Sequence, residues 1–330
     1  MKFSIIVPIF NRPDEARELM ESLSGQTFTD FELVLVEDGS LKACFNEVLT
    51  FRSLFTIRYF VKVNTGRSDS RNVGMNHAKG DYFLFFDSDC IIPPHYLETV
   101  NGLLNDDYVD CFGGPDKEQD SFSIMQKAIN YAMTSFWTTG GIRGGNKKME
   151  RFEPRTFNMG FSSKVFETVG GFKDMYGEDI ELSNRIRSAG FKIKLFPEAF
   201  VYHKRRVNLK KFYKQVHIFG QARINVYTLF PESLRLVHTL PALAVLGSLF
   251  ILFPVFFVSP WFLGLHAAYL MMLFIDSLVK TKNLLVAILS IVTSFLQITG
   301  YGTGFIYAFI KKILLRKGFE GRETLQKVYK

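Results

Sequence analysis

Short apolar runs near the N-terminus constrain the fold of this chain more than any other feature. Residues 3–7, 31–36 and 82–86 are continuous stretches rich in β-branched and aromatic residues. Such runs are typical of strands buried on both faces, as in parallel sheets that helices cover. Residues 57–63 predict a further strand, and 11–24 and 68–78 predict helices between the strands. Alternation of strand and helix predicts an α/β domain with a mostly parallel sheet.

Acidic residues follow two of these predicted strands. Glu37 and Asp38 come directly after residues 31–36, and Asp87 and Asp89 follow residues 82–86. Ligands of parallel sheets bind beyond the carboxyl ends of the strands, where both acidic pairs are expected. Two carboxylates one residue apart can hold a hard cation such as Mg²⁺, which shares its oxygen ligands with substrate phosphates. Taken alone, Glu37 and Asp38 are equally well explained as a turn that closes a strand, and Asp87 and Asp89 are a weak signal because such pairs are common in turns.

Two further candidate groups occur later in the chain. Glu178 and Asp179 follow Gly177 and open a predicted helix. Acidic residues at this position stabilise a helix N-terminus, but such a carboxylate can also deprotonate an attacking hydroxyl. His203 follows a strand-like segment. A neutral imidazole suits a borderline cation such as Mn²⁺, although a lone histidine more often has a structural role.

The order of these motifs resembles that of the inverting glycosyltransferases of family 2, which have the GT-A nucleotide-sugar-binding fold. The resemblance covers roughly residues 3 to 205. It is carried by SIIVPIFNR at 4–12, VEDGS at 36–40, SRNVGMNHAKGDY at 70–82, FDSD at 86–89, NMGF at 158–161, VGGF at 169–172 and the helix that begins at Glu178 and Asp179. Many motifs in one order make this resemblance specific.

The resemblance implies a nucleotide-sugar donor, with UDP as its nucleotide. Asp38 resembles the carboxylate that reads the base. Pro8 and either Arg67 or Arg71 would line the nucleotide. Glu37 belongs to the same motif, at a position where the family often has aspartate.

The resemblance also implies a divalent metal, Mg²⁺ or Mn²⁺, and a catalytic base. Asp87 and Asp89 match the pair that binds the metal and the ribose, with Asp89 as the direct metal ligand. His203 resembles a late ligand of the metal or the phosphates. Asp179 matches the catalytic base, with Glu178 as its neighbouring catalytic carboxylate.

The C-terminal third of the sequence has a different character. Residues 236–258, 261–279 and 283–310 are apolar, and a bilayer crossing needs about 20 such residues. The formal net charge is +8, and residues 202–235 hold eight basic residues against one acid. Because apolar segments follow this cluster directly, membrane lipids are the expected partner, and nucleic acid is not. The predicted organisation is a catalytic domain at 1–205, a basic interfacial linker at 206–235, three membrane segments within 236–310 and a basic tail at 311–330.

The third apolar segment leaves the topology open. It has 28 residues, long for one crossing and short for two. Gly300, Gly302 and Gly304 either break it into a re-entrant pair or form a close helix-packing face. The basic tail favours a cytoplasmic C-terminus. With three sparse cysteines and no signal peptide, the expected location is the inner (plasma) membrane, multi-pass, with the catalytic domain in the cytoplasm.

The expected function is therefore transfer of a single sugar to a glycan or lipid-linked acceptor. A processive polysaccharide synthase is the alternative enzyme, disfavoured because residues 221–225 read QARIN where such synthases carry Gln-x-x-Arg-Trp. A catalytically inactive membrane scaffold is disfavoured because every catalytic position is occupied. A dehydrogenase is excluded because no G-x-G-x-x-G motif follows the first strand.

Overall fold

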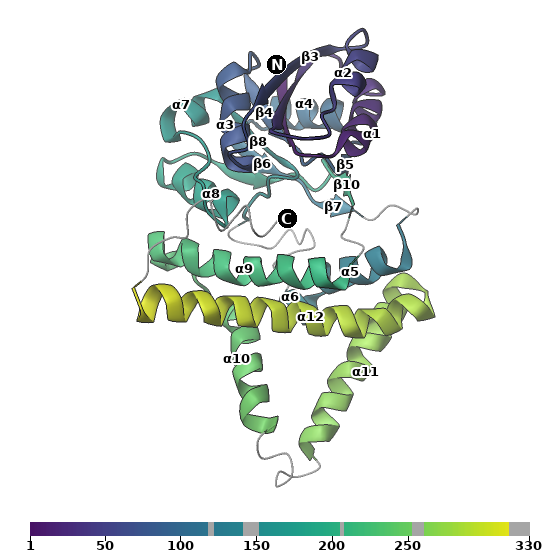
Figure 1. Ribbon diagram of the computed structural model, residues 1–330, viewed down its shortest axis with the longest axis vertical. Helices are drawn as coiled ribbons and strands as arrows, with labels where there is room; N and C mark the ends of the chain where they lie inside the picture. The colour runs from purple at the N-terminus through teal and green to yellow at the C-terminus, as the bar shows by residue number, and fades with distance from the viewer. Residues whose placement is uncertain (118–121, 141–151, 205–207, 253–260, 317–330) are drawn as a thin grey trace. The chain divides into compact units, whose positions relative to one another are not determined.

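The computed structural model describes residues 1–117, 122–140, 152–204, 208–252 and 261–316 (Figure 1). The chain divides into two compact units. The first contains the described residues up to 117 and those from 152 to 203. The second contains the remaining described residues.

A seven-stranded sheet forms the centre of the first unit, with the strand order β3-β2-β1-β4-β8-β6-β9. Its strands are β1 (Phe3–Ile9), β2 (Phe31–Asp38), β3 (Thr56–Lys62), β4 (Tyr82–Phe85), β6 (Cys111–Gly113), β8 (Met159–Ser162) and β9 (Ile193–Leu195). All neighbouring pairs are parallel except those of β8, which is antiparallel to β4 and β6. The predicted α/β fold with a mostly parallel sheet is confirmed.

Two layers of helices cover this sheet because its central strands are apolar on both faces. In β1, Ile5 and Val7 belong to one hydrophobic cluster and Ile6 to another. The first cluster includes residues of α1 (Pro13–Ser24), α2 (Phe45–Phe51) and α4 (Tyr96–Asp106), and the second includes residues of α3 (Arg67–His77), α7 (Ser163–Val169) and α8 (Glu178–Ser188). Figure 1 shows these two sets of helices on opposite sides of the sheet.

A second, three-stranded sheet brings distant segments of the first unit together. It consists of β5 (Cys90–Ile91), β10 (Val201–His203) and β7 (Asp116–Lys117), in the order β5-β10-β7. Its register pairs His203 with Cys90. The C-terminal end of the first unit therefore lies beside the segment that follows β4.

Helices make up the second unit. They are α5 (Ile124–Thr134), α6 (Phe136–Thr139), α9 (Leu209–Leu229), η1 (Pro231–Ser233), α10 (Leu236–Leu252), α11 (Trp261–Thr281), α12 (Leu284–Phe309) and the π-helical turn η2 (Ile310–Leu314). The segment predicted as a basic linker thus contains the 21-residue helix α9. Within this unit α9 and α12 run side by side, and α10 and α11 extend from them (Figure 1).

Glycines allow α9 and α12 to touch through their backbones. A Cβ atom at Gly304 would overlap the carbonyl oxygen of His217, and one at Gly220 would overlap that of Tyr301. Gly300 lies against Tyr213, so the two helices run in the same direction. Because α12 is continuous through these glycines, they form a packing face and not a break.

The prediction of three membrane segments is not confirmed. Among the described residues, the stretch Leu284–Leu314 is the one helix long and apolar enough to cross a membrane. The apolar part of α10, Leu236–Ser248, is shorter. Residues 253–260 lie outside the described residues, and the predicted basic tail is described only as far as Arg316.

We expect the substitution Gly304→Ala to destabilise the second unit. The added methyl group would overlap the backbone of α9, and overpacking of this kind costs about 1–3 kcal/mol. Denaturant unfolding in detergent measures the loss. Gly247→Ala in α10 is the control, because a Cβ there meets nothing within 4 Å. Equal stability of the two variants would contradict the proposed backbone contact.

Candidate active site

Alternating acidic and basic side chains meet at the carboxyl edge of the main sheet. Arg71 on α3 is 1% exposed. Its Nη2 lies 2.8 Å from Asp87 Oδ1, and its Nη1 lies 3.3 Å from Glu178 Oε1. Arg67, one turn earlier, places its Nε 3.0 Å from the same Glu178 oxygen. This chain of charges connects α3, the segment after β4 and the start of α8.

Asp38 holds the loop that leads into α3. Its carboxylate accepts hydrogen bonds of 2.9 Å from the backbone N–H groups of Thr65 and Gly66, and a third from the ammonium group of Lys62. Gly66 has φ of +98°, a conformation that favours glycine. In the structure this carboxylate is 4% exposed and fixes the start of α3. Its predicted contact with a base stays a prediction.

Glu37 lies deeper than Asp38. Its carboxylate accepts hydrogen bonds from the hydroxyl groups of Ser40 and Tyr59 and from the N–H of Cys44. With 1% exposure it stabilises the loop after β2. Pro8 lies near the end of β1, beside Val36 in the register. The structure therefore brings Pro8 and Asp38 to the same edge of the sheet.

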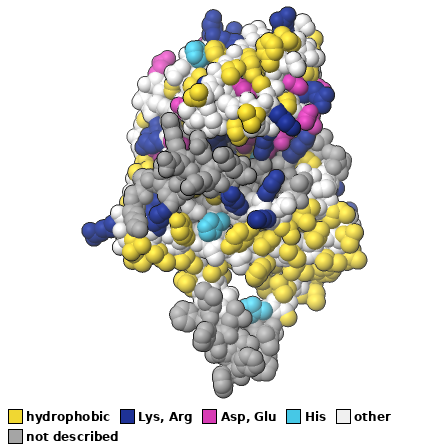
Figure 2. All heavy atoms as spheres, in the orientation of Figure 1, with side chains coloured by type: hydrophobic (Ala, Val, Ile, Leu, Met, Phe, Trp, Pro, Cys, Tyr) yellow, Lys and Arg dark blue, Asp and Glu magenta, His cyan; other side chains and the backbone are white. Residues whose placement is uncertain are grey.

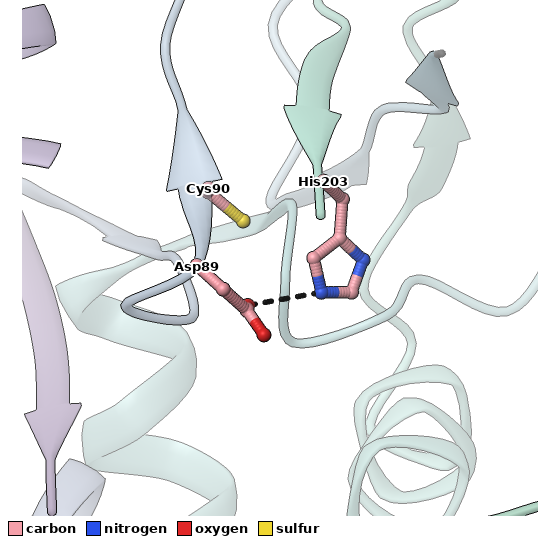
Figure 3. Close-up of side chains that lie close together, drawn as sticks. All are labelled: Asp89, Cys90 and His203. Atoms are coloured by element: carbon pink, nitrogen blue, oxygen red, sulfur yellow. Dashed lines mark ion pairs between the residues drawn. The ribbon is translucent and has the colours of Figure 1, made fainter. Parts of the chain in front are cut away.

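Asp89 and His203 face each other where β5 and β10 pair, at one end of the small sheet (Figure 3). Asp89 Oδ1 lies 3.1 Å from His203 Nε2, and Asp89 Oδ2 lies 3.2 Å from Arg12 Nη1. Phe157 stacks on the His203 ring at a centroid distance of 4.8 Å and holds its plane. Residues separated by more than 100 positions thus form one compact group.

The donor set of this group fits a divalent cation. Asp89, Cys90 and His203 each offer one ligand atom, all within 4.8 Å of one another. Burial raises the pKa of the Cys90 thiol well above its usual value, and its Sγ–H is directed at the carbonyl oxygen of Phe157. Thiolate ligands select softer cations, so a hard or borderline cation would be left with one carboxylate and one imidazole. This pair suits Mn²⁺, which accepts both oxygen and imidazole donors.

Asp179 occupies a separate position at the start of α8. Burial by itself would raise the pKa of Asp179, but the charge of Arg155 and the hydrogen bond from the Ile180 N–H outweigh it. The pKa therefore lies below its usual value, and the group is a carboxylate at neutral pH. Arg155 Nη1 lies 3.3 Å from Asp179 Oδ2. Glu178, although adjacent in sequence, is paired with Arg67 and Arg71 instead.

Sequence reasoning assigned no role to two arginines of this site. Arg12 contacts both Asp89 and Glu15, and Glu15 also accepts a hydrogen bond from Ser88. Arg12 belongs to the motif at residues 4–12, so the sequence could have indicated that it is part of the site. Arg155 lies in a stretch without periodicity, where no sequence pattern indicated a role for it.

The family model for glycosyl transferase family 2 matches residues 4–170. The glycosyltransferase GlyA of Streptococcus pneumoniae is 36% identical over 100 residues, which cover 30% of this chain and 14% of that protein. The poly(ribitol-phosphate) beta-N-acetylglucosaminyltransferase TarS of Staphylococcus aureus is 33% identical over 114 residues, 33% of this chain and 20% of TarS. The chain thus matches less than half the length of either relative.

Solved structures show the same fold. The mannosyltransferase PcManGT of Pyrobaculum calidifontis, solved in complex with GDP-Man and Mn²⁺, superposes with a TM-score of 0.64 at 16% identity, covering 89% of this chain and 86% of that one. The crystal structure of S. aureus TarS gives a TM-score of 0.50 at 19% identity, over 69% of this chain and 39% of TarS. With the family model matching half of its 330 residues, this chain belongs to glycosyl transferase family 2.

Proposed function

We propose that this protein is an inverting glycosyltransferase that moves one sugar from a UDP-sugar to a glycan or lipid-linked acceptor. One observation carries the proposal. At the carboxyl edge of a family 2 sheet, Asp89 and His203 form a metal-type donor pair, while Asp179 is held apart as an ionised carboxylate. This separation provides one place for the diphosphate and another for a base.

Different residues of the chain would bind the metal and the nucleotide of the donor. A divalent cation bound by Asp89 and His203 would stabilise the charge on the leaving diphosphate. Arg12 and Phe157 hold this donor pair in place. Pro8 and Asp38 lie at the sheet edge where the nucleotide of the donor would bind.

Asp179 is the proposed base. As a carboxylate at neutral pH it accepts the proton of the acceptor hydroxyl while that oxygen attacks the anomeric carbon. The bond to the diphosphate breaks on the opposite side, which inverts the anomeric centre. Arg155 orients Asp179 before the acceptor arrives.

Membrane attachment is part of the proposal. Nucleotide-sugars are made in the cytoplasm, so the first unit is placed there, at the inner membrane. The apolar helices of the second unit would hold the enzyme near a lipid-linked acceptor. The apolar stretch Leu284–Leu314 supports this attachment.

Replacement of Asp89 tests the metal site. Asp89→Ala removes the carboxylate of the donor pair, so Mn²⁺ should no longer strengthen the binding of UDP. Calorimetric titration of UDP with and without Mn²⁺ measures the effect. Asp14→Ala, at a side chain that is 88% exposed, is the control. Parent-like Mn²⁺ dependence in Asp89→Ala would refute the assignment.

Replacement of Asp179 tests the base. Asp179→Asn keeps the size of the side chain but removes its basicity, so transfer should slow by roughly 10²–10⁴ while donor binding remains. Single-turnover transfer and donor titration separate the two quantities. If Asp179→Asn transfers sugar at the parent rate, the base is another group.

Replacement of Glu178 tests its role as the partner of two arginines. Glu178→Gln leaves the buried guanidinium of Arg71 with one carboxylate fewer, and breaking a buried pair costs about 3–5 kcal/mol. We expect the lower end of this range, because glutamine retains a hydrogen-bond acceptor. Denaturant unfolding of Glu178→Gln against the exposed variant Glu167→Gln measures the loss. Unchanged stability with lost transfer would instead make Glu178 a catalytic carboxylate.

A further inference from the structure

The buried face of α12 is polar along its middle turns, which is unusual for a helix packed in a water-soluble protein. Its buried face carries Ser290, Thr293, Ser294 and Gln297. Ser290 bonds to Ser277 of α11 at 2.8 Å, and Thr293 donates to the carbonyl oxygen of Ala128 on α5 at 2.9 Å. Polar residues facing neighbouring helices are typical of helices that contact lipid on their other side.

The opposite face of α12 is apolar and exposed. Leu285, Ile288, Val292 and Phe295 follow one another at helical spacing, with exposed fractions of 43% to 63%. We call these four residues the apolar face. Figure 2 shows hydrophobic side chains gathered over this part of the second unit. An exposed apolar surface of this kind marks an interaction site.

The second unit also shows which way this face points. Gly304 contacts α9, whereas Gly302, seven residues after Phe295 and so on the same side as the apolar face, meets the backbone of α10 at Pro241. The apolar face is therefore turned away from α9 and towards the side from which α10 leaves. In Figure 1, α10 and α11 extend from α12 on the side opposite to α9.

The contact with α9 argues against a simple crossing by α12. The two helices touch through their backbones and run in the same direction, so they share one orientation relative to a bilayer. Yet α9 has exposed lysines at positions 210, 211 and 214. Among the described residues, it is not a helix apolar enough to cross a membrane. A crossing by α12 would draw these charges into hydrocarbon, which is strongly unfavourable.

Charge at the two ends of α12 agrees with a helix that lies flat. Lys280 and Lys282 precede it, and Lys311, Lys312 and Arg316 follow it. Cations flanking both ends complement anionic headgroups when both ends are on the same membrane surface. A spanning helix would place one of these groups on the far side.

We propose that α12 lies along the surface of an anionic lipid bilayer with its apolar face in the lipid, on the side from which α10 and α11 extend. This inference rests on the membrane attachment included in the proposed function. Both ends of α12 then stay on the side of α9. The one described helix that is long and apolar enough to cross a membrane is, in this arrangement, an interfacial helix and not a membrane span.

Single cysteines test the sidedness of α12 in the full chain. Lys282→Cys and Arg316→Cys mark its two ends, and Lys42→Cys marks the first unit. The native cysteines at 44, 90 and 111 are buried, and the parent measures their background. We expect a membrane-impermeant maleimide to label all three variants in inside-out vesicles and none in right-side-out vesicles. Labelling of Arg316→Cys and Lys282→Cys from opposite sides would overturn the inference.

Nitroxide labels test the depth of the helix. Leu285→Cys, Val292→Cys and Ile310→Cys lie along one side of α12 and its π-helical end, and about 37 Å separates the first from the last. A flat helix gives similar, shallow depths at all three, whereas a span gives depths that change steadily along it. Lys214→Cys on α9 is the control and should report the aqueous side.

Two other results would also overturn the inference. One is that the protein does not float with vesicles containing anionic lipid. The other is that it covers the apolar face by forming a dimer in solution. None of these measurements depends on sugar transfer. An inactive protein with a flat α12 would therefore contradict the proposed enzymatic activity and leave this inference supported.

Discussion

The buried guanidinium of Arg71 is the interaction on which the candidate site depends. It is almost fully shielded from water and pairs with Asp87 after β4 and with Glu178 at the start of α8. A buried charge is tolerated only when it is paired, so the three segments must meet at this point for any of them to be stable there. That requirement fixes the start of α8, and with it Asp179, relative to the carboxyl edge of the sheet.

The neighbouring carboxylates of this site have different chemical environments because different cations face them. Asp89 faces Arg12 and His203, Asp179 faces Arg155, and Glu178 is taken up by Arg67 and Arg71. The charge of Arg155 keeps the pKa of Asp179 low despite burial. Similar side chains can therefore hold a metal, accept a proton or orient a guanidinium, depending on their partners.

In the second unit, the backbone contact between α9 and α12 and the buried polar side chains of α12 have a common consequence. Glycines bring α9 and α12 so close that the two helices share one orientation, and the polar side chains of α12 face inward. The apolar residues that remain outside are those best suited to lipid. The glycines thus fix the orientation of α12 relative to α9, although none of them is part of the apolar face.

The sequence by itself determined the α/β class, the first four parallel strands and the edge at which the acidic motifs collect. These depend on local patterns, namely continuous apolar runs and the acids that end them, and the structure reproduces them with β1 to β4. The antiparallel β8, the small sheet that joins His203 to Asp89, and the pairing of Arg155 with Asp179 were decided by tertiary structure. Each joins residues distant in the chain or lacking periodicity, so no local pattern could indicate it. The sequence left two roles open for the glycines of α12, and only the presence of α9 and α10 beside them decided that they pack, because a close backbone approach requires a second helix.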